Sequence, residues 1–401
     1  MTERLFRDDP YLLEFEARVV GCREHEGRPA VVLDRTAFYA ESGGQPWDLG
    51  ELGGAAVLAV VEAPEGTILH VLDRPLAEGH TVRGRVDAAR RRDHREQHHG
   101  QHLLSRAFVE VAQAPTTSFH LGAEASTIDL EREVDDGTVR RAEARANEVV
   151  WAARPVAVRV VTRREADALG VNVPEGAGDA VRLVEASGFD LQACGGTHPR
   201  STAEVGMVVV LDHDRYKGGS RVRFVCGHRA LEAFHSRAAV LRELAGLFSS
   251  SLEDLPAAGR RALDALASAE RERRLLLERA LEGEARRLLA RLEDASRPAL
   301  VVATYDGWPA ADLRVLAQKL VALAPCVALL GSRADKAHLV FAQSPGLGHD
   351  VPALLRAAVA TLGGRGGGKG DLAQGGGDRA DLLEDALAAA ARAVRGDASA
   401  A

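Results

Sequence analysis

The sequence is poor in cysteine. Four cysteines occur among 401 residues, and no two of them form a CxxC pair. This excludes a disulfide framework and a zinc ribbon built from paired cysteines. Apolar runs are short as well, and none approaches the roughly 20 residues that a membrane-spanning helix needs. The first residues lack the basic, apolar and small-residue order of a secretory signal. We therefore expect a cytoplasmic protein with no membrane segment.

An excess of positive charge is also missing. The formal net charge is -7 at pH 7, which excludes a protein that coats nucleic acid along its whole surface. Contacts with RNA would have to come from local basic patches. One patch, on a predicted hairpin, holds Arg215, Lys217, Arg221 and Arg223, and another holds Arg365 and Lys369 within GGRGGGKGDLAQGGG. This glycine-rich stretch is predicted to be a loop whose N–H groups and cations contact phosphate, with a flexible linker as the alternative.

Four segments differ in composition. The first alternates short β-branched runs with Gly, Pro and Asp, which is typical of a small antiparallel sheet or barrel. A charged helix and mixed strands follow, then a stretch of Leu, Ala, Arg and Glu, and last an alternation of strands and helices. We predict an α+β fold with four modules: a β-barrel module at 1–86, an α+β domain at 87–229, a helical arm at 230–297 and an α/β domain at 298–401.

The helical arm contains leucines at intervals of four, seven and four residues, which places them on one helical face. These are Leu277, Leu281, Leu288 and Leu292. Their spacing leaves two interpretations open. The arm is either a solvated connector or a coiled-coil seam that forms a homodimer.

Two pairs of candidate metal ligands lie far apart in the sequence. His98 and His102 are four residues apart in a stretch with helical character, so both imidazoles share one face. Cys194 and His198 flank two glycines that permit a tight turn. Three histidines and one cysteine suit tetrahedral Zn²⁺. The alternative is a buried cysteine beside unrelated surface histidines. The motif HExxH is absent because Glu96 stands at the wrong offset for a zinc-protease base.

The stretch TAFYAESGGQ combines polar side chains with two adjacent glycines. Gly43 and Gly44 allow the backbone to approach a ligand, while Thr36, Glu41 and Gln45 supply polar groups. A plain hairpin loop is the alternative interpretation.

Together these motifs resemble those of a known family. HxxxH followed about ninety residues later by CGGTH is similar to the editing domain shared by alanyl-tRNA synthetases and the free-standing AlaX-type trans-editing proteins. Three further stretches agree with this resemblance. They are TAFYAESGGQPWDLG (36–50), SFHLG (118–122) and the glycine-rich 363–377, which resembles the signature of the C-terminal DHHA1 domain.

The resemblance implies an aminoacyl-tRNA hydrolase that removes serine, or glycine as a second candidate, from mischarged alanine tRNA. It also implies roles for individual residues. The zinc ligands would be His98, His102, Cys194 and His198; the catalytic residues Thr36 and Gln45; and the substrate-binding residues Glu41, Gly43, Gly44, Gly195, Gly196 and Thr197. We expect Arg221, Arg223, Arg365 and Lys369 to contact tRNA.

The sequence departs from the family at His94 and His99, where small or polar residues are usual, and His94 could compete for the metal. Nothing before the barrel resembles an ATP-binding aminoacylation domain, so we expect an editor without a synthetase. Three alternatives remain. A DHH-type phosphodiesterase would need an Asp-His-His cluster, which is not found, and a threonyl-tRNA-type editing module would lack ESGGQ. A catalytically inactive RNA-binding module would fail a deacylation assay.

Overall fold

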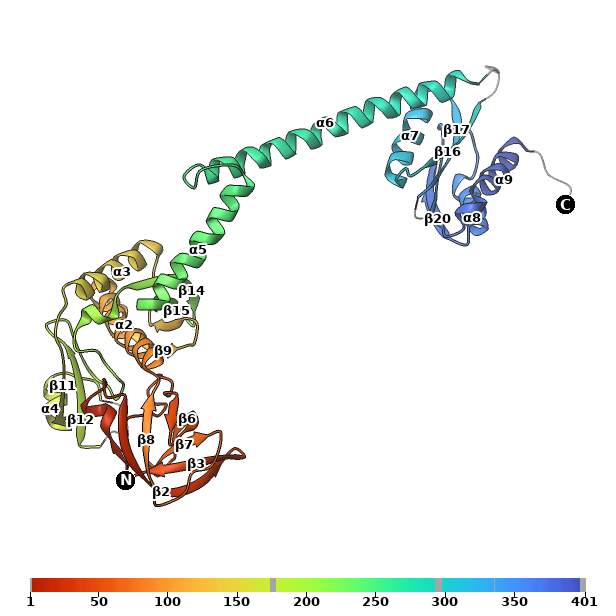
Figure 1. Ribbon diagram of the computed structural model, residues 1–401. Helices are drawn as coiled ribbons and strands as arrows, with labels where there is room; N and C mark the ends of the chain where they lie inside the picture. Colours follow the sequence, from red (N-terminus) through yellow and green to blue (C-terminus); the bar gives the residue numbers. More distant parts are fainter. Residues whose placement is uncertain (1, 174–177, 293–297, 335, 397–401) are drawn as a thin grey trace. The chain divides into compact units, whose positions relative to one another are not determined.

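The computed structural model describes residues 2–173, 178–292, 298–334 and 336–396. They form two compact units, residues 1–244 and 245–401, which are described separately below. Both units mix helices and strands (Figure 1), so the predicted α+β class is confirmed. No helix in the described ranges is long and apolar enough to cross a membrane. The module boundaries at 86, 229 and 297 stay predictions.

The first unit opens with a closed six-stranded barrel in the order β2-β3-β7-β6-β5-β8 (Figure 1). Along β2, alternate residues point inward, and Phe15, Ala17 and Val19 are buried, which is the period of two that a half-buried strand requires. The predicted β-rich opening is therefore confirmed. The strands are β2 (Glu14–His25), β3 (Arg28–Leu33), β5 (Gly50–Leu52), β6 (Ala55–Glu62), β7 (Ile68–Leu72) and β8 (Thr81–Val86); β1 (Glu3–Arg4), α1 (Leu5–Asp8) and β4 (Arg35–Thr36) complete this region.

Helix α2 (Ala88–Ala112) follows the barrel directly. It begins at Asp87, whose side chain accepts hydrogen bonds from the backbone N–H groups of the first turn. Most of its polar middle is buried, including His98 and His102. At Gly100 a Cβ would lie 2.2 Å from Sγ of Cys226, so glycine allows α2 to approach strand β15 closely. A buried polar helix of this kind is expected where a site is built on it.

Two further sheets and helix α3 (Asp136–Trp151) complete the first unit. One sheet has the order β14-β15-β10-β9 and the other β11-β12-β13. The predicted hairpin that carries Arg221 and Arg223 is β14 and β15. The bounds are β9 (Thr116–Leu121), β10 (Ser126–Leu130), β11 (Val156–Thr162), α4 (Arg163–Ala168), β12 (Ala180–Ala186), β13 (Asp190–Ala193), β14 (Val208–Tyr216) and β15 (Gly219–Cys226). Helix α5 (Gly227–Leu247) crosses the division between the units.

The second unit is a five-stranded sheet, β16-β17-β18-β20-β19, with helices on both faces. Ala328 and Leu330 of β17 pack with α6 and α7, whereas Val327 and Leu329 pack with α8 and α9. Burial on both faces explains the unbroken apolar run of this strand. The elements are α6 (Leu255–Ala290), β16 (Ala299–Asp306), α7 (Ala310–Leu323), β17 (Cys326–Arg333), β18 (Ala337–Gln343), α8 (Val351–Thr361), β19 (Arg365–Lys369), β20 (Leu372–Gly377) and α9 (Leu383–Arg395).

The leucine face of α6 is covered within the chain. Leu277, Leu281 and Leu288 pack in a cluster with α7 and the sheet, and Leu281 is only 2% exposed. Leu292 lies beyond the last residue of α6. The coiled-coil interpretation of these leucines is therefore wrong, because heptad spacing reveals an apolar face but not its partner. Whether the chain dimerises through another surface is a separate question that these contacts leave untested.

The glycine-rich stretch at 363–377 is a β-hairpin and not the predicted loop. Strands β19 and β20 pair antiparallel and form one edge of the sheet. A Cβ at Gly375 would lie 2.6 Å from Cα of Gly366, and one at Gly368 would lie 2.3 Å from the carbonyl oxygen of Leu372. Glycine is depleted in strands generally, but here it allows close approach of two backbones.

Candidate metal centre

Four side chains with metal-ligating atoms meet between α2 and the segment after β13. His98 and His102 project from one face of α2, while Cys194 and His198 come from the CGGTH turn. Their ligand atoms all lie within 4.8 Å of one another. Sγ of Cys194 is 3.3 Å from Nε2 of His98 and 3.1 Å from Nε2 of His198. This donor set and its compactness fit a tetrahedral zinc ion.

The CGGTH turn owes its path to Gly196. A Cβ at this position would lie 2.2 Å from Cε1 of His98, a distance that no other amino acid can accommodate. Gly195 faces open space and is exposed. Nη1 of Arg182 donates to the carbonyl oxygens of Cys194 and Gly196 at 2.8 Å and 3.1 Å. The glycine and the arginine together fix where the two ligands of this turn point.

Each histidine of the cluster has a partner on the Nδ1 side. Nδ1 of His102 lies 3.2 Å from Oδ2 of Asp190, and Nδ1 of His198 lies 3.1 Å from Nδ1 of His99. Nδ1 of His98 donates to Gln45, so Nε2 of each ring is free to face the cluster. Such outer partners orient metal-bound imidazoles. His94 is buried on α2 but lies outside the group of four, and His99 acts behind His198.

Electrostatics favour a thiolate at Cys194. Burial alone would raise the pKa of this thiol, but the charges of His98, His198 and His102 hold it well below its ordinary value. Burial also acts to lower the pKa of His102, yet the Cys194 thiolate and Asp190 raise it to about 10. A metal that binds His102 must therefore displace a proton. This coupling makes metal affinity depend on pH.

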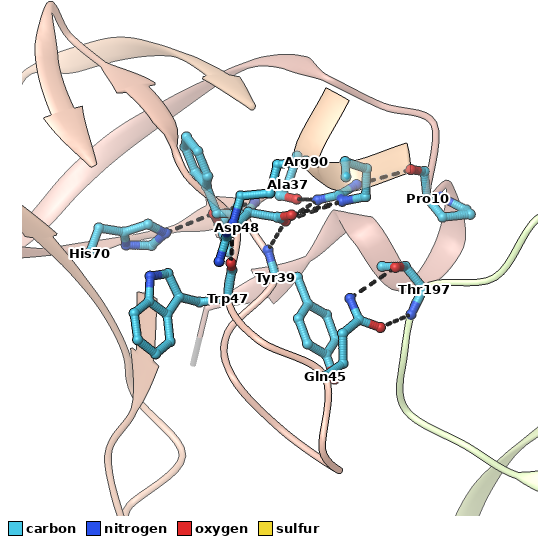
Figure 2. Close-up of polar contacts among 12 residues, drawn as sticks. Pro10, Ala37, Tyr39, Gln45, Trp47, Asp48, His70, Arg90 and Thr197 are labelled. Carbon is cyan, nitrogen blue, oxygen red and sulfur yellow. Dashed lines mark hydrogen bonds and ion pairs between the residues drawn. The ribbon is translucent and has the colours of Figure 1, made fainter. Parts of the chain in front are cut away.

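Gln45 joins the barrel to the metal centre. Its side chain is fully buried, and Oε1 accepts from Nδ1 of His98 at 2.8 Å and from the backbone N–H of Thr197 at 3.0 Å. Nε2 donates to Oγ1 of Thr197 at 3.0 Å, so the amide of Gln45 forms hydrogen bonds with both the backbone N–H and the hydroxyl of Thr197 (Figure 2). Gln45 ends a tight turn in which Gly43 and Gly44 have φ values of 53° and 78°, a conformation that favours glycine at both positions.

A buried ion pair attaches this loop to α2. Asp48 accepts from the backbone N–H of Tyr39 at 2.7 Å and pairs with Arg91 of α2, and both charged side chains are at most 1% exposed. Arg91 also donates to the carbonyl oxygens of Ala37 and Pro10. Because the buried guanidinium is paired with a carboxylate and also hydrogen-bonded to two carbonyl oxygens, it holds the loop firmly against α2. Neither residue was singled out from the sequence, although Asp48 lies inside the recognised stretch 36–50.

Thr36 lies inside the barrel, away from solvent. It is fully buried, and its hydroxyl is 2.8 Å from Nε2 of His70 and accepts from the backbone N–H of Phe38 at 3.1 Å. Nδ1 of His70 is 3.3 Å from the carbonyl oxygen of Val31. Burial lowers the pKa of His70 to about 4, so the ring is neutral and its Nδ1–H donates to Val31. The Thr36 hydroxyl then donates to Nε2, because that nitrogen has no proton.

The other predicted site residues do not join the metal cluster. Glu41 is exposed at the mouth of the glycine turn. Arg221 binds Asp129 through two hydrogen bonds and lies over the ring of Tyr216, and Arg223 pairs with Asp212. Arg365 and Lys369 are exposed at the two ends of β19 in the second unit.

A cavity of about 330 Å³ opens beside Cys194, the half-exposed member of the cluster. Arg7 and Arg182 line it, together with Ala193 and Gly195. Burial, and less strongly the repulsion from Arg7, lowers the pKa of Arg182, while the Cys194 thiolate opposes this shift. Sequence reasoning missed both arginines, because isolated arginines at 7 and 182 carry no motif.

Three family models match the chain: class II tRNA synthetases (A) over residues 12–90, the threonyl and alanyl tRNA synthetase second additional domain over 181–223, and the DHHA1 domain over 297–396. The second of these covers the CGGTH turn and strands β12 and β13. Fold and matches therefore define a module of the kind attached to threonyl- and alanyl-tRNA synthetases.

Curated relatives narrow this class. The alanyl-tRNA editing protein AlaX-L of Pyrococcus horikoshii is 30% identical, and the match covers 94% of each chain. The alanine–tRNA ligase of Halobacterium salinarum is 35% identical over all of this chain but only 45% of its own length. The chain thus spans less than half the length of this ligase. It belongs to the AlaX-L family of alanyl-tRNA editing proteins.

Among solved structures, the C-Ala domain of Aquifex aeolicus alanyl-tRNA synthetase is 28% identical and covers 24% of this chain and 88% of its own, with a TM-score of 0.23. That score is too low to support a conclusion about the fold.

Proposed function

We propose that the chain hydrolyses the ester that joins a wrong amino acid to alanine tRNA, with seryl-tRNA as the first substrate and glycyl-tRNA as the second. The observation that carries this proposal is the cluster of His98, His102, Cys194 and His198 in a chain of the AlaX-L family. The relatives are named for alanyl-tRNA editing and alanine–tRNA ligation. Both involve the same tRNA.

The four clustered residues would hold one zinc ion. Bound there, zinc would polarise the ester carbonyl or lower the pKa of an attacking water. Asp190, His99 and Gln45 orient the three imidazoles through their Nδ1 atoms. Cys194 is the ligand nearest the open cavity, so we infer that the ester approaches from its side. Gln45 is then a positioning residue, because it contacts His98 and Thr197.

We infer that Thr36 distinguishes serine from alanine. Its hydroxyl donates to His70 and accepts from Phe38, which leaves one lone pair for a further donor. Because Thr36 is fully buried, we infer that the barrel opens to admit the amino acid; a serine hydroxyl can then donate to that lone pair, whereas the methyl group of alanine cannot. Polar discrimination of this kind can exceed what size alone achieves by orders of magnitude. Glycine has no hydroxyl, so cleavage of glycyl-tRNA would need a second criterion.

A deacylation assay tests the proposed function. Purified protein is mixed with alanine tRNA charged with serine or with alanine, and release of the amino acid is followed. We expect rapid loss of serine, slow loss of alanine and no activity in Cys194→Ala. The variant Cys22→Ala is the matched control, because Cys22 is exposed on the barrel. An unreactive wild-type protein that still binds tRNA would support the inactive RNA-binding module instead.

A phosphodiesterase function finds less support. In the described part of the chain, the group of four in the first unit is the one cluster of three or more candidate ligands. The DHHA1-like unit offers exposed cations on β19. We therefore propose that it adds affinity for tRNA without chemistry of its own.

A further inference from the structure

Beside Cys194, two arginines face one cavity that no carboxylate of the described residues lines. We propose that Arg7 and Arg182 form a subsite for the phosphate group of the substrate's 3′-terminal nucleotide. This inference rests on the proposed function, since it names a part of the tRNA that the same site would hold. Neither arginine has a role in any motif of the sequence.

Arg182 is only partly satisfied. Nη1 is used by the carbonyl oxygens of Cys194 and Gly196, but Nε and Nη2 are buried and have no hydrogen-bond partner among the described residues. A buried donor without a partner is destabilising. A guanidinium in this state is ready to bind a group with several acceptor oxygens.

Arg7 is exposed and forms no hydrogen bond or ion pair among the described residues, and the charges of Arg4, Glu62 and Asp8 act on it only through space. It lies in α1, a short helix that precedes the barrel, and it lines the cavity together with residues of the CGGTH turn. Asp8 is the next residue, and its charge attracts both Arg7 and Arg182, although it forms an ion pair with neither of them within the described ranges. Arg7 repels Arg182, whereas the Cys194 thiolate attracts Arg182 more strongly.

The chemistry of the cavity selects a phosphate. Two guanidiniums present forked donors, which match phosphate oxygens well. A cavity of about 330 Å³ is large enough for a phosphate and part of a nucleoside. The α-ammonium group of the aminoacyl ester carries a positive charge, and the arginines would repel it. The nucleotide phosphate must then lie at the arginines while the amino acid points away from them, past Cys194.

A neighbouring pocket shows the contrast. It is lined by Arg92 and Arg95, but also by Glu96 and Glu204. The carboxylates there compensate the arginines, so that pocket offers little to an anion. The cavity at Cys194 has no carboxylate in its described lining.

Calorimetric titration with adenosine, adenosine 5′-monophosphate and inorganic phosphate separates the contributions of the nucleoside and of the phosphate to the binding free energy. We expect wild-type protein to bind the monophosphate about tenfold more tightly than adenosine, and the variant Arg7→Gln to bind the two within about twofold. Arg18→Gln is the control, because Arg18 is exposed on β2 and its replacement removes the same charge. Arg182→Lys should weaken monophosphate binding as well, but it also disturbs the CGGTH turn, so the decision rests on Arg7→Gln.

Kinetics supply a second measurement. With seryl-tRNA, Arg7→Gln should raise KM about tenfold and leave kcat and zinc content nearly unchanged, because the arginine binds a group remote from the ester. Equal binding of the monophosphate by wild type and Arg7→Gln overturns the subsite. Inorganic phosphate that binds as tightly as the monophosphate overturns the assignment to a nucleotide. A wild-type protein that binds the monophosphate through Arg7 but cleaves no aminoacyl-tRNA overturns the proposed function and leaves the subsite standing.

Discussion

Oε1 of Gln45 lies 2.8 Å from Nδ1 of His98 and accepts a hydrogen bond from it. The two residues come from different parts of the first unit, a turn of the barrel and the middle of α2. The same oxygen accepts from Thr197, next to His198 in the CGGTH turn. One barrel side chain therefore contacts a candidate ligand on α2 and the residue next to a candidate ligand in the CGGTH turn, and it fixes the tautomer of His98.

Replacement of Gln45 by alanine should lower zinc affinity. The change removes the acceptor of His98 and leaves two buried groups of Thr197 unpaired. Loss of such an outer partner typically weakens metal binding by about 10- to 100-fold. Competition with a chelator measures the effect, and Gln374→Ala, at an exposed residue of the second unit, is the control. Wild-type affinity in Gln45→Ala would show that the hydrogen bond to His98 does not orient the ligand.

Purified protein should contain about one equivalent of zinc per chain, and Cys194→Ala should lose most of it. The thiolate is the only anionic donor of the cluster, so its removal lowers affinity more than loss of a neutral imidazole. Elemental analysis after dialysis measures the ratio of metal to protein. Cys22→Ala should keep its zinc. Full occupancy in Cys194→Ala would remove this cysteine from the ligand set.

Thr36→Val should reduce the cleavage of seryl-tRNA relative to alanyl-tRNA by about tenfold or more. Valine keeps the shape of threonine but offers no lone pair to a serine hydroxyl. Thr36→Ser, which keeps the hydroxyl, should retain most of the preference, and zinc content should be the same in all three proteins. If the ratio of the two rates does not change, serine is recognised elsewhere.

Folding stability should fall as the pH is lowered from about 6.5 to 4, in part through His70. The pKa of its ring is about 4 in the barrel, against an ordinary value of 6.5, so the unfolded chain binds the extra proton first. The contribution of His70 to the free energy of unfolding is fully present above pH 6.5. Between pH 6.5 and 4 it falls by about 1.4 kcal/mol per pH unit, to a total loss of about 3 kcal/mol. Denaturant unfolding should show a smaller loss in His70→Gln than in wild type. Equal losses in both proteins would mean that the native ring is protonated.

Removal of the two cations of β19 should weaken tRNA binding. In the double variant Arg365→Gln with Lys369→Gln, we expect lower affinity and a shallower dependence of affinity on salt, because fewer counterions are released. The control double variant, Arg356→Gln with Arg392→Gln, removes the same charge from exposed positions on α8 and α9. An identical salt dependence in wild type and the β19 variant would exclude a phosphate contact there.

Local sequence patterns predicted the elements whose causes are local. The spacing of His98 and His102 placed both on one face of α2, and alternation of apolar residues indicated the barrel. The partners of the ligands could not be foreseen. Asp190 and Arg182 act only because β12 and β13 bring them to the cluster, and no spacing connects them with α2 beforehand.

Two predictions from the sequence, the coiled-coil seam and the glycine-rich loop, were wrong for the same physical reason. The leucines of α6 form an apolar face, but that face packs on α7 and not on a second copy. The glycines of β19 and β20 have low strand propensity, and their pairing is set by close contact of the two backbones. In both cases tertiary packing decides what the local pattern leaves open.

The ion pair between Asp48 and Arg91 limits how the metal centre could be transplanted. With both charges buried, cutting the chain between barrel and helix would expose one partner and strand the other, at a cost of about 3–5 kcal/mol. Gln45 would be lost from behind His98 by the same cut. A designer who wishes to graft this candidate metal centre onto another scaffold must therefore move the barrel together with the four candidate ligands, as a single unit.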